Sequence, residues 1–433
     1  MRILIAVHHF PPNFTGGAEW EAYRTASQLI SYGHEVRVLC VENAYSKNIT
    51  PDYKDEQFNG IPVRRLSLDL SLSPDPFLWE YDNLWIGQCL KKTMEDFKPD
   101  IFHLFGGYLI SGRSLVIARR QGVPSIVTLM DMWFLCRRIA MLRSDGTLSK
   151  IPIQTEACVR CYLEERLYSR LLAKIFPLWA GLYRSRKKDL IPKFEERHRF
   201  LLDAINQADL IISRSNFLKA LYVDAGVDPE RIKYIRQGQY FSSVRAEDLQ
   251  KASSKYLRVG YFGQIAWHKG VHILLAALRR LPEEDYRATV YGNLNSFPQY
   301  SGKLKRLVRK RKNIALAGII GQDSMWQAMR ELDVVVVPSI NYENSPNVIL
   351  QAFVYRTPVV VSNLGGMAEL VEHEKNGLLF NPGDASDLAL QLRRLKEDTD
   401  LLYRLREGIG TVKSMAEEMD ELLEIYRRFV AGK

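Results

Sequence analysis

Residues 333–353 combine, in order, an apolar run, a polar loop and a helical pattern. Residues 334–337 are four consecutive valines, which is typical of a strand covered on both faces, as in a parallel sheet. Pro338 ends the run, and Asn347 is placed to cap a helix of apolar residues, with Pro346 just outside it. The loop therefore falls at the carboxyl end of a strand, where open α/β sheets bind ligands.

Strand–loop–helix units of this kind recur in two series. In the first, apolar runs at 3–7 and 35–41 flank a helix expected near 18–32, with Gly33 at its C-terminal cap. The second series restarts at Leu257, after a polar, weakly periodic stretch. Further strands are expected near 100–105, 208–213, 257–263 and 288–292. The sequence predicts an α/β protein with two Rossmann-like, doubly wound domains.

The spacing inside the central loop is specific enough to indicate a family. Glu343 is followed after seven residues by Gln351, and a glutamate with a second acidic residue at that distance resembles the signature of retaining, nucleotide-sugar-dependent glycosyltransferases of family 4 type, with the GT-B fold. In that family the first glutamate contacts the donor sugar and the second carboxylate holds the ribose. Glu343 matches the first position, and Gln351 departs from the second. The alternative for Glu343 is an exposed loop carboxylate.

The resemblance implies two domains that face each other across a cleft. Residues 1–237 form an N-terminal, acceptor-side domain with a basic insertion at about 162–200, and 238–256 form a linker. Residues 257–410 form the domain that binds the nucleotide sugar. Residues 411–433 form a last helix that crosses back to the first domain.

The resemblance also places further donor-side residues. Lys269 and Gly270 match the family's phosphate-facing pair, and the lysine would neutralise the leaving diphosphate, although an exposed lysine at a helix start is the alternative. Gln264 stands where the family often has an arginine. The remaining donor-binding residues expected are Gly16, Gly17, Gly263, Gly292, Gly318, Asn344, Ser345 and Asn347.

On the acceptor side, Gly16 and Gly17 leave room for a phosphate or sugar to approach the backbone, or they form a plain tight loop. The dinucleotide spacing Gly-x-Gly-x-x-Gly is not present there, which argues against a nicotinamide cofactor. Glu19, His103 and Asp131 are the acceptor-side candidates, although a lone histidine in a strand is often structural. Met130 stands where the family often carries a histidine, so no general base is assigned there.

The five cysteines raise the question of a metal site. Cys158 and Cys161 have the spacing of a ligand pair, and Cys136 is a third thiol, but relatives with another cysteine near position 149 differ from this chain, which has Ser149. Three thiols do not complete a closed zinc site. We expect reduced structural thiols, no metal and no cofactor besides the nucleotide sugar as co-substrate.

The net charge of +10 indicates an anionic partner. Residues 164–199 carry ten lysines and arginines against five acidic residues, around an apolar, aromatic segment at 175–183. This pattern suits peripheral contact with a membrane, and equally a solvated basic face. Without a signal-peptide pattern or an apolar run of ~20 residues, we expect a cytoplasmic protein, peripheral on the inner face of the membrane, with no nucleic acid partner.

These observations favour an enzyme that moves a sugar from a nucleoside diphosphate sugar to a hydroxyl of a glycan or lipid-linked acceptor, in polysaccharide or cell-surface glycan biosynthesis. The resemblance implies retention of anomeric configuration, with the leaving phosphate taking the acceptor's proton. The alternative is a non-catalytic nucleotide-sugar-binding subunit that regulates or scaffolds a partner transferase. Met130, Gln264 and Gln351 motivate this alternative.

Overall fold

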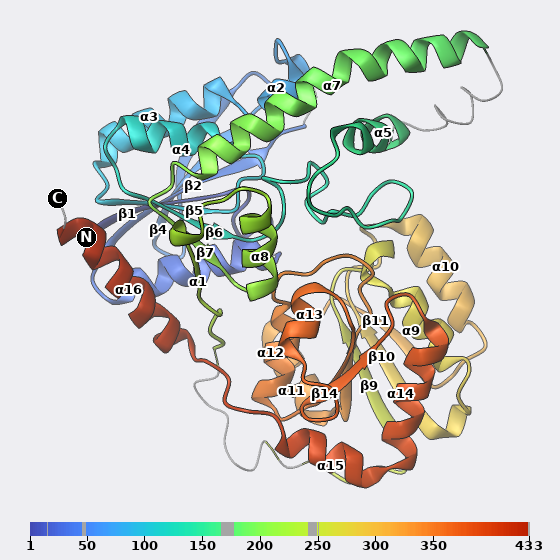
Figure 1. The fold of residues 1–433 in the computed structure, drawn as a ribbon. Coiled ribbons are helices and arrows are strands. Elements are labelled where there is room, and N and C mark those ends of the chain that lie inside the picture. Colours follow the sequence, from blue (N-terminus) through green and yellow to red (C-terminus); the bar gives the residue numbers. More distant parts are fainter. Residues whose placement is uncertain (15, 46–48, 166–176, 241–248, 250, 432–433) are drawn as a thin grey trace. The chain divides into compact units, whose positions relative to one another are not determined.

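The chain forms two compact units in a computed structural model that describes residues 1–14, 16–45, 49–165, 177–240, 249 and 251–431 (Figure 1). Unit 1 contains Met1–Arg236 together with Glu418–Lys433, and unit 2 contains Gln237–Glu417. The second boundary falls inside the last helix, α16 (Met415–Ala431). Unit 1 is therefore built from both ends of the sequence.

Unit 1 contains a sheet in which parallel pairing predominates. Its order is β3-β4-β2-β1-β5-β6-β7-β8, and the antiparallel pair is β3 with β4. Asn59 and Gly60 join these two strands with φ of 49° and 79°, as a tight hairpin turn requires. The strands are β1 (Arg2–Val7), β2 (Glu35–Asn43), β3 (Asp52–Phe58), β4 (Ile61–Ser67), β5 (Ile101–Phe105), β6 (Ser125–Leu129), β7 (Leu210–Ser213) and β8 (Ile232–Tyr234).

Helices cover both faces of this sheet, with α1 on one side and α3 and α4 on the other (Figure 1). The Asn83 side chain caps α3 by accepting from the Ile86 amide, and Ser215 caps α8 through the Leu218 amide. Part of the predicted basic insertion, residues 166–176, lies outside the described residues. The helices are α1 (Gly17–Ser31), α2 (Pro76–Trp79), α3 (Leu84–Phe97), α4 (Arg113–Arg120), α5 (Thr155–Glu165), α7 (Pro177–Ile205), α8 (Asn216–Asp224) and α16.

Unit 2 contains a parallel sheet of order β11-β10-β9-β12-β13-β14. The order reverses between β9 and β12, which are the first and fourth strands along the chain. The valines of β12 are buried throughout, as their apolar run predicts. The strands are β9 (Leu257–Phe262), β10 (Tyr286–Tyr291), β11 (Ile314–Gly318), β12 (Val334–Val337), β13 (Val359–Ser362) and β14 (Gly377–Phe380).

Two apolar clusters cover the two faces of the unit 2 sheet. One packs α9 and α14 against the strands, and the other packs α11, α12 and α13 against them (Figure 1). The predicted α/β class with doubly wound, mainly parallel sheets is therefore confirmed. The helices are α9 (Val271–Leu278), α10 (Pro298–Val308), α11 (Gln322–Glu331), α12 (Asn347–Val354), α13 (Gly365–Leu370), α14 (Ala385–Glu397) and α15 (Thr399–Glu407).

Candidate functional site

In unit 2 the candidate residues gather where the strand order reverses. Lys269 ends a short 3-10 turn, Trp267–Lys269, that follows β9, and Glu343 lies in the loop that follows β12. Because β9 and β12 are parallel neighbours, both segments leave the sheet at its carboxyl edge. Open α/β sheets bind their ligands at such a switch point.

Lys269 and Glu343 form a direct ion pair. The Lys269 Nζ atom lies 2.6 Å from Glu343 Oε1, within hydrogen-bond distance. Their side chains are 26% and 16% exposed, so both can be reached from solvent. The pair therefore presents a positive charge and a hydrogen-bond acceptor side by side.

Two glycines hold the loop that carries Glu343. Gly270 has a φ of 72°, and a Cβ atom there would lie 1.8 Å from the Pro338 carbonyl oxygen. A Cβ atom on Gly366 would lie 1.5 Å from the Asn344 carbonyl oxygen, and the Gly366 amide donates to the Glu343 carbonyl at 2.9 Å. Only glycine permits these approaches. The ends of the loop are thus fixed by turns that follow β9 and β13.

The predicted N-cap role of Asn347 is wrong. Helix α12 begins at Asn347 itself, its cap position is Pro346, and no side-chain cap hydrogen bond is made. The Asn347 Oδ1 atom instead accepts from Gln239 Nε2 at 3.0 Å, because the segment that enters unit 2 lies against the loop. Gln237 Nε2 donates to the Ser345 carbonyl at 2.7 Å. Sequence reasoning missed these two glutamines, since they lie in a stretch read only as a connection.

A buried hydroxyl in this loop has no partner among the described residues. The Ser345 Oγ atom is inaccessible to solvent and makes no hydrogen bond there. Buried polar groups are rarely left unpaired in folded proteins, and such a group often marks a functional position. Ser345 therefore stays among the donor-side candidates.

The other donor-side candidates follow neighbouring strands of the same sheet. Gly263 follows β9, Gly292 follows β10, and Gly318 ends β11. A Cβ atom on Gly292 would lie 2.1 Å from the Gly263 carbonyl oxygen, and the Gly292 amide donates to Gly318 at 2.8 Å. Gln264 comes directly after Gly263, and Gln351 is half-buried on α12. The structure thus brings the predicted unit 2 residues to one sheet edge.

In unit 1, Glu19 is held at the start of α1 beside the end of β1. Its Oε1 atom lies 3.3 Å from His8 Nε2. Burial is the largest influence and raises the pKa of Glu19, but the hydrogen bond and charge of His8, a backbone hydrogen bond and the charge of His9 together outweigh it and leave the pKa below its usual value. A Cβ atom on Gly16 would meet the Glu19 carboxylate at 2.5 Å, and Gly17 has open space around it. His8 was not singled out from sequence, although its place directly after a buried strand was a usable signal.

Asp131 follows β6 at the same sheet edge. Its Oδ1 atom accepts from the Trp133 amide at 2.7 Å, and burial raises the pKa of Asp131 to about 6. A carboxyl group that titrates near neutral pH suits proton transfer. Tyr108 follows β5, and its ring lies 5.7 Å from the His8 ring. The carboxyl ends of β1, β5 and β6 therefore bring His8, Tyr108 and Asp131 into one neighbourhood.

His103 lies inside the unit 1 core rather than at the surface. It is 1% exposed, and its Nδ1 atom lies 2.6 Å from the Tyr426 hydroxyl while Nε2 lies 2.8 Å from Thr128 Oγ1. Burial lowers the pKa of His103 to about 3. With both ring nitrogens engaged, these contacts favour the structural interpretation, in which His103 ties β5 to α16.

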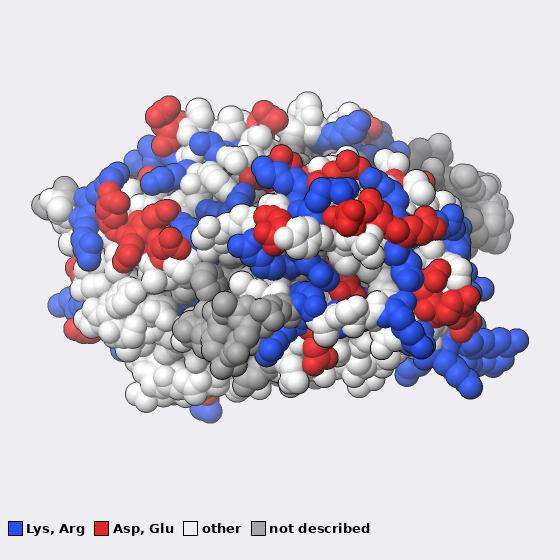
Figure 2. Space-filling view, turned by 90° about the horizontal axis from the view of Figure 1, so that it is seen from below, with Lys and Arg blue, Asp and Glu red and all other residues white. Residues whose placement is uncertain are grey.

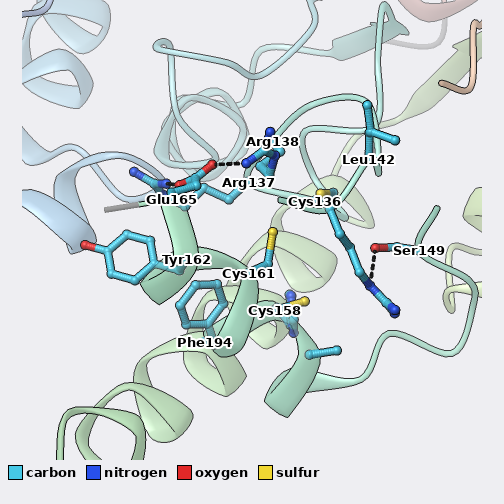
Figure 3. Close-up of a pocket in the computed structure, with 13 residues that line it drawn as sticks. Cys136, Arg137, Arg138, Leu142, Ser149, Cys158, Cys161, Tyr162, Glu165 and Phe194 are labelled. Carbon is cyan, nitrogen blue, oxygen red and sulfur yellow. Dashed lines mark hydrogen bonds and ion pairs between the residues drawn. The ribbon is translucent and has the colours of Figure 1, made fainter. Parts of the chain in front are cut away.

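Three cysteines line one pocket of unit 1, of about 410 Å³ (Figure 3). Burial raises the pKa of Cys136 and raises that of Cys158 to about 11, and Cys161 Sγ accepts from the Ser144 amide. The Ser149 hydroxyl accepts from Arg143 at 3.2 Å. Within the described part of the chain, no group of three or more His, Cys, Asp or Glu residues is arranged to hold a metal ion.

The fold class is that of the GT-B glycosyltransferases. The structure aligns over its full length with sucrose-phosphate synthase from Thermosynechococcus elongatus, which is also fully covered, at a TM-score of 0.69 and 19% identity. It aligns over 99% of its length with all of HepE from Anabaena, solved with UDP-glucose, at a TM-score of 0.64 and 19% identity. At these identities the likeness establishes the fold.

Sequence comparison narrows the class. Residues 256–398 match the family model "Glycosyl transferases group 1", and residues 16–170 match "Glycosyl transferase 4-like domain". The chain is 29% identical over 407 residues to an uncharacterized glycosyltransferase of Methanocaldococcus jannaschii, covering 92% of this chain and 90% of that protein. The comparisons therefore support a glycosyltransferase. Among the described helices, none is long and apolar enough to span a membrane.

Proposed function

We propose that this chain is a retaining glycosyltransferase that moves a sugar from a nucleoside diphosphate sugar to a hydroxyl of a glycan or lipid-linked acceptor, in polysaccharide or cell-surface glycan biosynthesis. The ion pair of Lys269 and Glu343 at the switch point of the unit 2 sheet carries the proposal. The place is that of a ligand site in this class of fold. The positive charge of Lys269 suits the diphosphate of a nucleotide sugar, and the carboxylate of Glu343 suits the hydroxyl groups of its sugar.

Lys269 is assigned to the diphosphate. As the bond to the anomeric carbon breaks, negative charge grows on the leaving phosphate, and a fixed cation beside it lowers the barrier. Amides at the start of α12 add hydrogen-bond donors of the kind that hold anionic oxygens. No metal ion is needed in this scheme, because the ammonium group of Lys269 and the backbone amides stabilise the negative charge of the diphosphate.

Glu343 is assigned to the hydroxyl groups of the donor sugar. An ionised carboxylate only accepts hydrogen bonds, and sugar hydroxyls can donate them. The glycine contacts that fix the loop keep this carboxylate in one place. Ser345, Asn344 and Asn347 lie in the same segment and complete the proposed donor-binding set with Gly263, Gln264, Gly292, Gly318 and Gln351.

In the proposed mechanism the leaving phosphate accepts the proton of the acceptor hydroxyl on the same face of the sugar. The new bond then forms on the side from which the nucleotide departs, and configuration is retained. No side-chain base is required, which is compatible with Met130 beside Asp131. Gln351 replaces a carboxylate by an amide, which costs on the order of 1–2 kcal/mol of donor binding.

A uridine nucleotide is the first donor to test. HepE, which shares this fold, was solved with UDP-glucose. On the face drawn in Figure 2, basic side chains are interspersed with acidic ones. A small anionic substrate such as a nucleotide sugar is an anionic partner of the kind that a net charge of +10 indicates.

Peripheral contact with the inner face of a membrane belongs to the same proposal. On α7, Arg186 and Lys188 are exposed, while Lys187 pairs with Glu156 at 3.0 Å and Lys193 with Asp75 at 2.9 Å. Part of the apolar segment at 175–183 lies outside the described residues. Cosedimentation with anionic and neutral vesicles tests the contact, since basic residues bind only the anionic ones appreciably.

Thermal stabilisation by UDP, GDP, ADP and their common sugar conjugates tests the donor site. A ligand present at 100 times its dissociation constant adds ~2.7 kcal/mol to stability. We expect one sugar nucleotide to stabilise the wild type more than its bare nucleotide, and Glu343→Ala to remove this difference. Stabilisation with no transfer to any acceptor would favour a non-catalytic subunit, and no stabilisation by any nucleotide would contradict the proposal.

A further inference from the structure

A second pocket of unit 1 opens beside the candidate acceptor-side residues. It encloses about 600 Å³ of space open to solvent. Four aromatic side chains from separate segments form its walls, namely Tyr45, Trp79, Tyr108 and Trp133. Tyr108 contacts the His8 ring, and the Trp133 amide donates to Asp131, so the pocket adjoins the carboxyl ends of β1, β5 and β6.

The charged side chains that line this pocket are those of Arg137, Arg138 and Glu80. Arg137 forms a bidentate ion pair with Glu80, in which the Nε and NH2 atoms lie 2.5 Å and 2.6 Å from the two carboxylate oxygens. Its NH1 atom lies 3.1 Å from Glu165, which Arg138 also contacts at 2.7 Å. Two cations therefore meet two carboxylates. Glu165 belongs to the lining of the other pocket, which shares Arg137 and Arg138, so each guanidinium has a carboxylate partner while the lining offers both donors and acceptors.

The aromatic wall is held rigidly. A Cβ atom on Gly107 would lie 2.4 Å from the Trp133 ring, so glycine is what permits this packing. The guanidinium carbon of the buried Arg197 lies 5.6 Å from the centroid of the Trp133 ring, and Arg197 donates to the Trp133 carbonyl at 2.7 Å. Rigid walls reduce the ordering cost when a ligand binds.

The backbone around the pocket is strained at two lining residues. Leu109 has a φ of 59° and Ile139 a φ of 70°. The left-handed region is unfavourable for a bulky residue and most of all for a β-branched one. Such strain tends to cluster at ligand sites, where the surrounding structure maintains it. This observation is independent of the residue types in the pocket and also indicates a binding site.

We propose that this pocket binds a neutral pyranose ring of a glycan acceptor. The inference rests on the proposed glycosyltransferase function and names the chemistry of its acceptor. The C–H face of a sugar ring is apolar and packs on aromatic faces, while its hydroxyls both donate and accept hydrogen bonds. Glu80 and Arg137 supply the complementary acceptors and donors. A phosphate or sulfate group would find each guanidinium already paired, so a neutral ring fits best.

Direct sugar binding to the full chain tests the proposal apart from transfer. The probes are methyl α- and β-glucosides, galactosides and mannosides and the matching disaccharides, measured by saturation-transfer NMR. We expect at least one to bind, and Trp79→Ala to weaken it about tenfold or more. Trp79→Phe should retain most of the affinity, because it keeps an aromatic face. Tyr32→Ala, at an aromatic residue of the same unit that is 42% exposed, is the control and should not change binding.

Nucleotide stabilisation of the same proteins separates the two possible failures. If UDP or another nucleotide stabilises the chain but no glycoside binds, or Trp79→Ala binds as wild type does, the pocket assignment is overturned and the proposed function survives. Binding of only sugar phosphates or alkyl phosphates would also overturn it. If no nucleotide binds but the glycosides bind through Trp79, the proposed function fails while the pocket remains a sugar site. A wild-type circular dichroism spectrum and a wild-type urea unfolding curve of Trp79→Ala show that unit 1, which contains the pocket, is folded in the variant.

Discussion

The side chains of Lys269 and Glu343 form an ion pair at 2.6 Å. A substrate that contacts this pair changes the surroundings of both charges. A partly exposed ion pair contributes little to folding stability. Its value here is to hold two groups ready at the point where strand order reverses. Substitutions at this pair should therefore affect ligands more than the fold.

We predict that Lys269→Ala weakens nucleoside diphosphate binding by about 10- to 100-fold, because a hydrogen bond to a charged group contributes ~1.5–3 kcal/mol. Binding of the bare nucleoside should be unchanged. Isothermal titration with UDP and uridine, or with the nucleotide pair that binds best, measures both. Equal losses for the two ligands would show that Lys269 does not face the phosphates.

Asp131 leads to a pH-dependent prediction. Its pKa of about 6 exceeds the model-compound value of 3.8, so the folded state holds the proton more tightly than the unfolded state. The stability that depends on this proton is present below pH ~4 and is lost as pH rises through about 6. Asp131→Asn should therefore raise stability at pH 8 by up to about 3 kcal/mol and change it little at pH 4. Melting temperatures at both values test this, and an equal gain at both would contradict it.

At the scale of elements, the loop after β12 depends on its contact with the start of α13 (Gly365–Leu370). Gly366→Ala would push a methyl group into the Asn344 carbonyl, which lies 1.5 Å from the ideal Cβ position. We predict a loss of transfer of more than tenfold with a stability cost of about 1–3 kcal/mol, because the loop must move. Enzyme assays and urea unfolding measure the two effects.

Gly302→Ala is the matched control for this prediction. Gly302 lies in α10 with no atom near its ideal Cβ position. Alanine is preferred to glycine inside helices by up to about 1 kcal/mol, so this variant should be as stable as wild type or more stable and equally active. If both variants had the same activity and the same stability, the close approach of the Asn344 carbonyl to Gly366 would not matter for the loop.

Much of the fold could be predicted because buried parallel strands leave an unmistakable apolar run. The four valines of β12 and the residues of β9 were placed within a residue of their observed bounds. The β3–β4 hairpin was missed because Asp52–Phe58 is mostly polar, even though Asn59 and Gly60 marked its turn. A strand at a sheet edge has less need of apolar residues, so periodicity alone does not reveal it.

The candidate sites were only partly predictable, because contacts between distant segments have no local signal. Nothing near Glu343 in sequence indicates Lys269 as its partner or Gln239 as the partner of Asn347. Those contacts follow from strand order. The resemblance to known enzymes predicted that Lys269 and Glu343 belong to the same donor site. It offered no indication of His8 or of the aromatic pocket.

At the scale of the whole molecule, the last helix completes the first unit. Arg214 contacts Glu21 of α1 and Glu418 of α16, and the three side chains are at most 5% exposed. Tyr426, also on α16, bonds to His103 in β5. This buried charge cluster links segments about 200 residues apart in the sequence, so we expect α16 to unfold together with the rest of unit 1.

We predict that Arg214→Ala lowers the free energy of unfolding by about 3–5 kcal/mol, because it leaves two buried carboxylates without a cation. Arg428→Ala on the same helix removes an exposed pair with Glu424 and should change stability by less than about 0.5 kcal/mol. Urea unfolding of both variants provides the comparison. If Arg214→Ala lowered the free energy of unfolding as little as Arg428→Ala does, the charge cluster would not stabilise unit 1, and α16 would contribute through apolar packing alone.

The division of unit 1 between the two ends of the chain has a consequence for biosynthesis. At ~5–20 residues per second, a ribosome needs on the order of 10–40 s after Arg236 before it has made α16. Throughout that interval the nascent first unit exposes the surface that α16 later covers, and unit 2 is complete before it. The emerging chain is therefore a natural client for chaperones during translation, and arrest before residue 415 should yield an insoluble fragment.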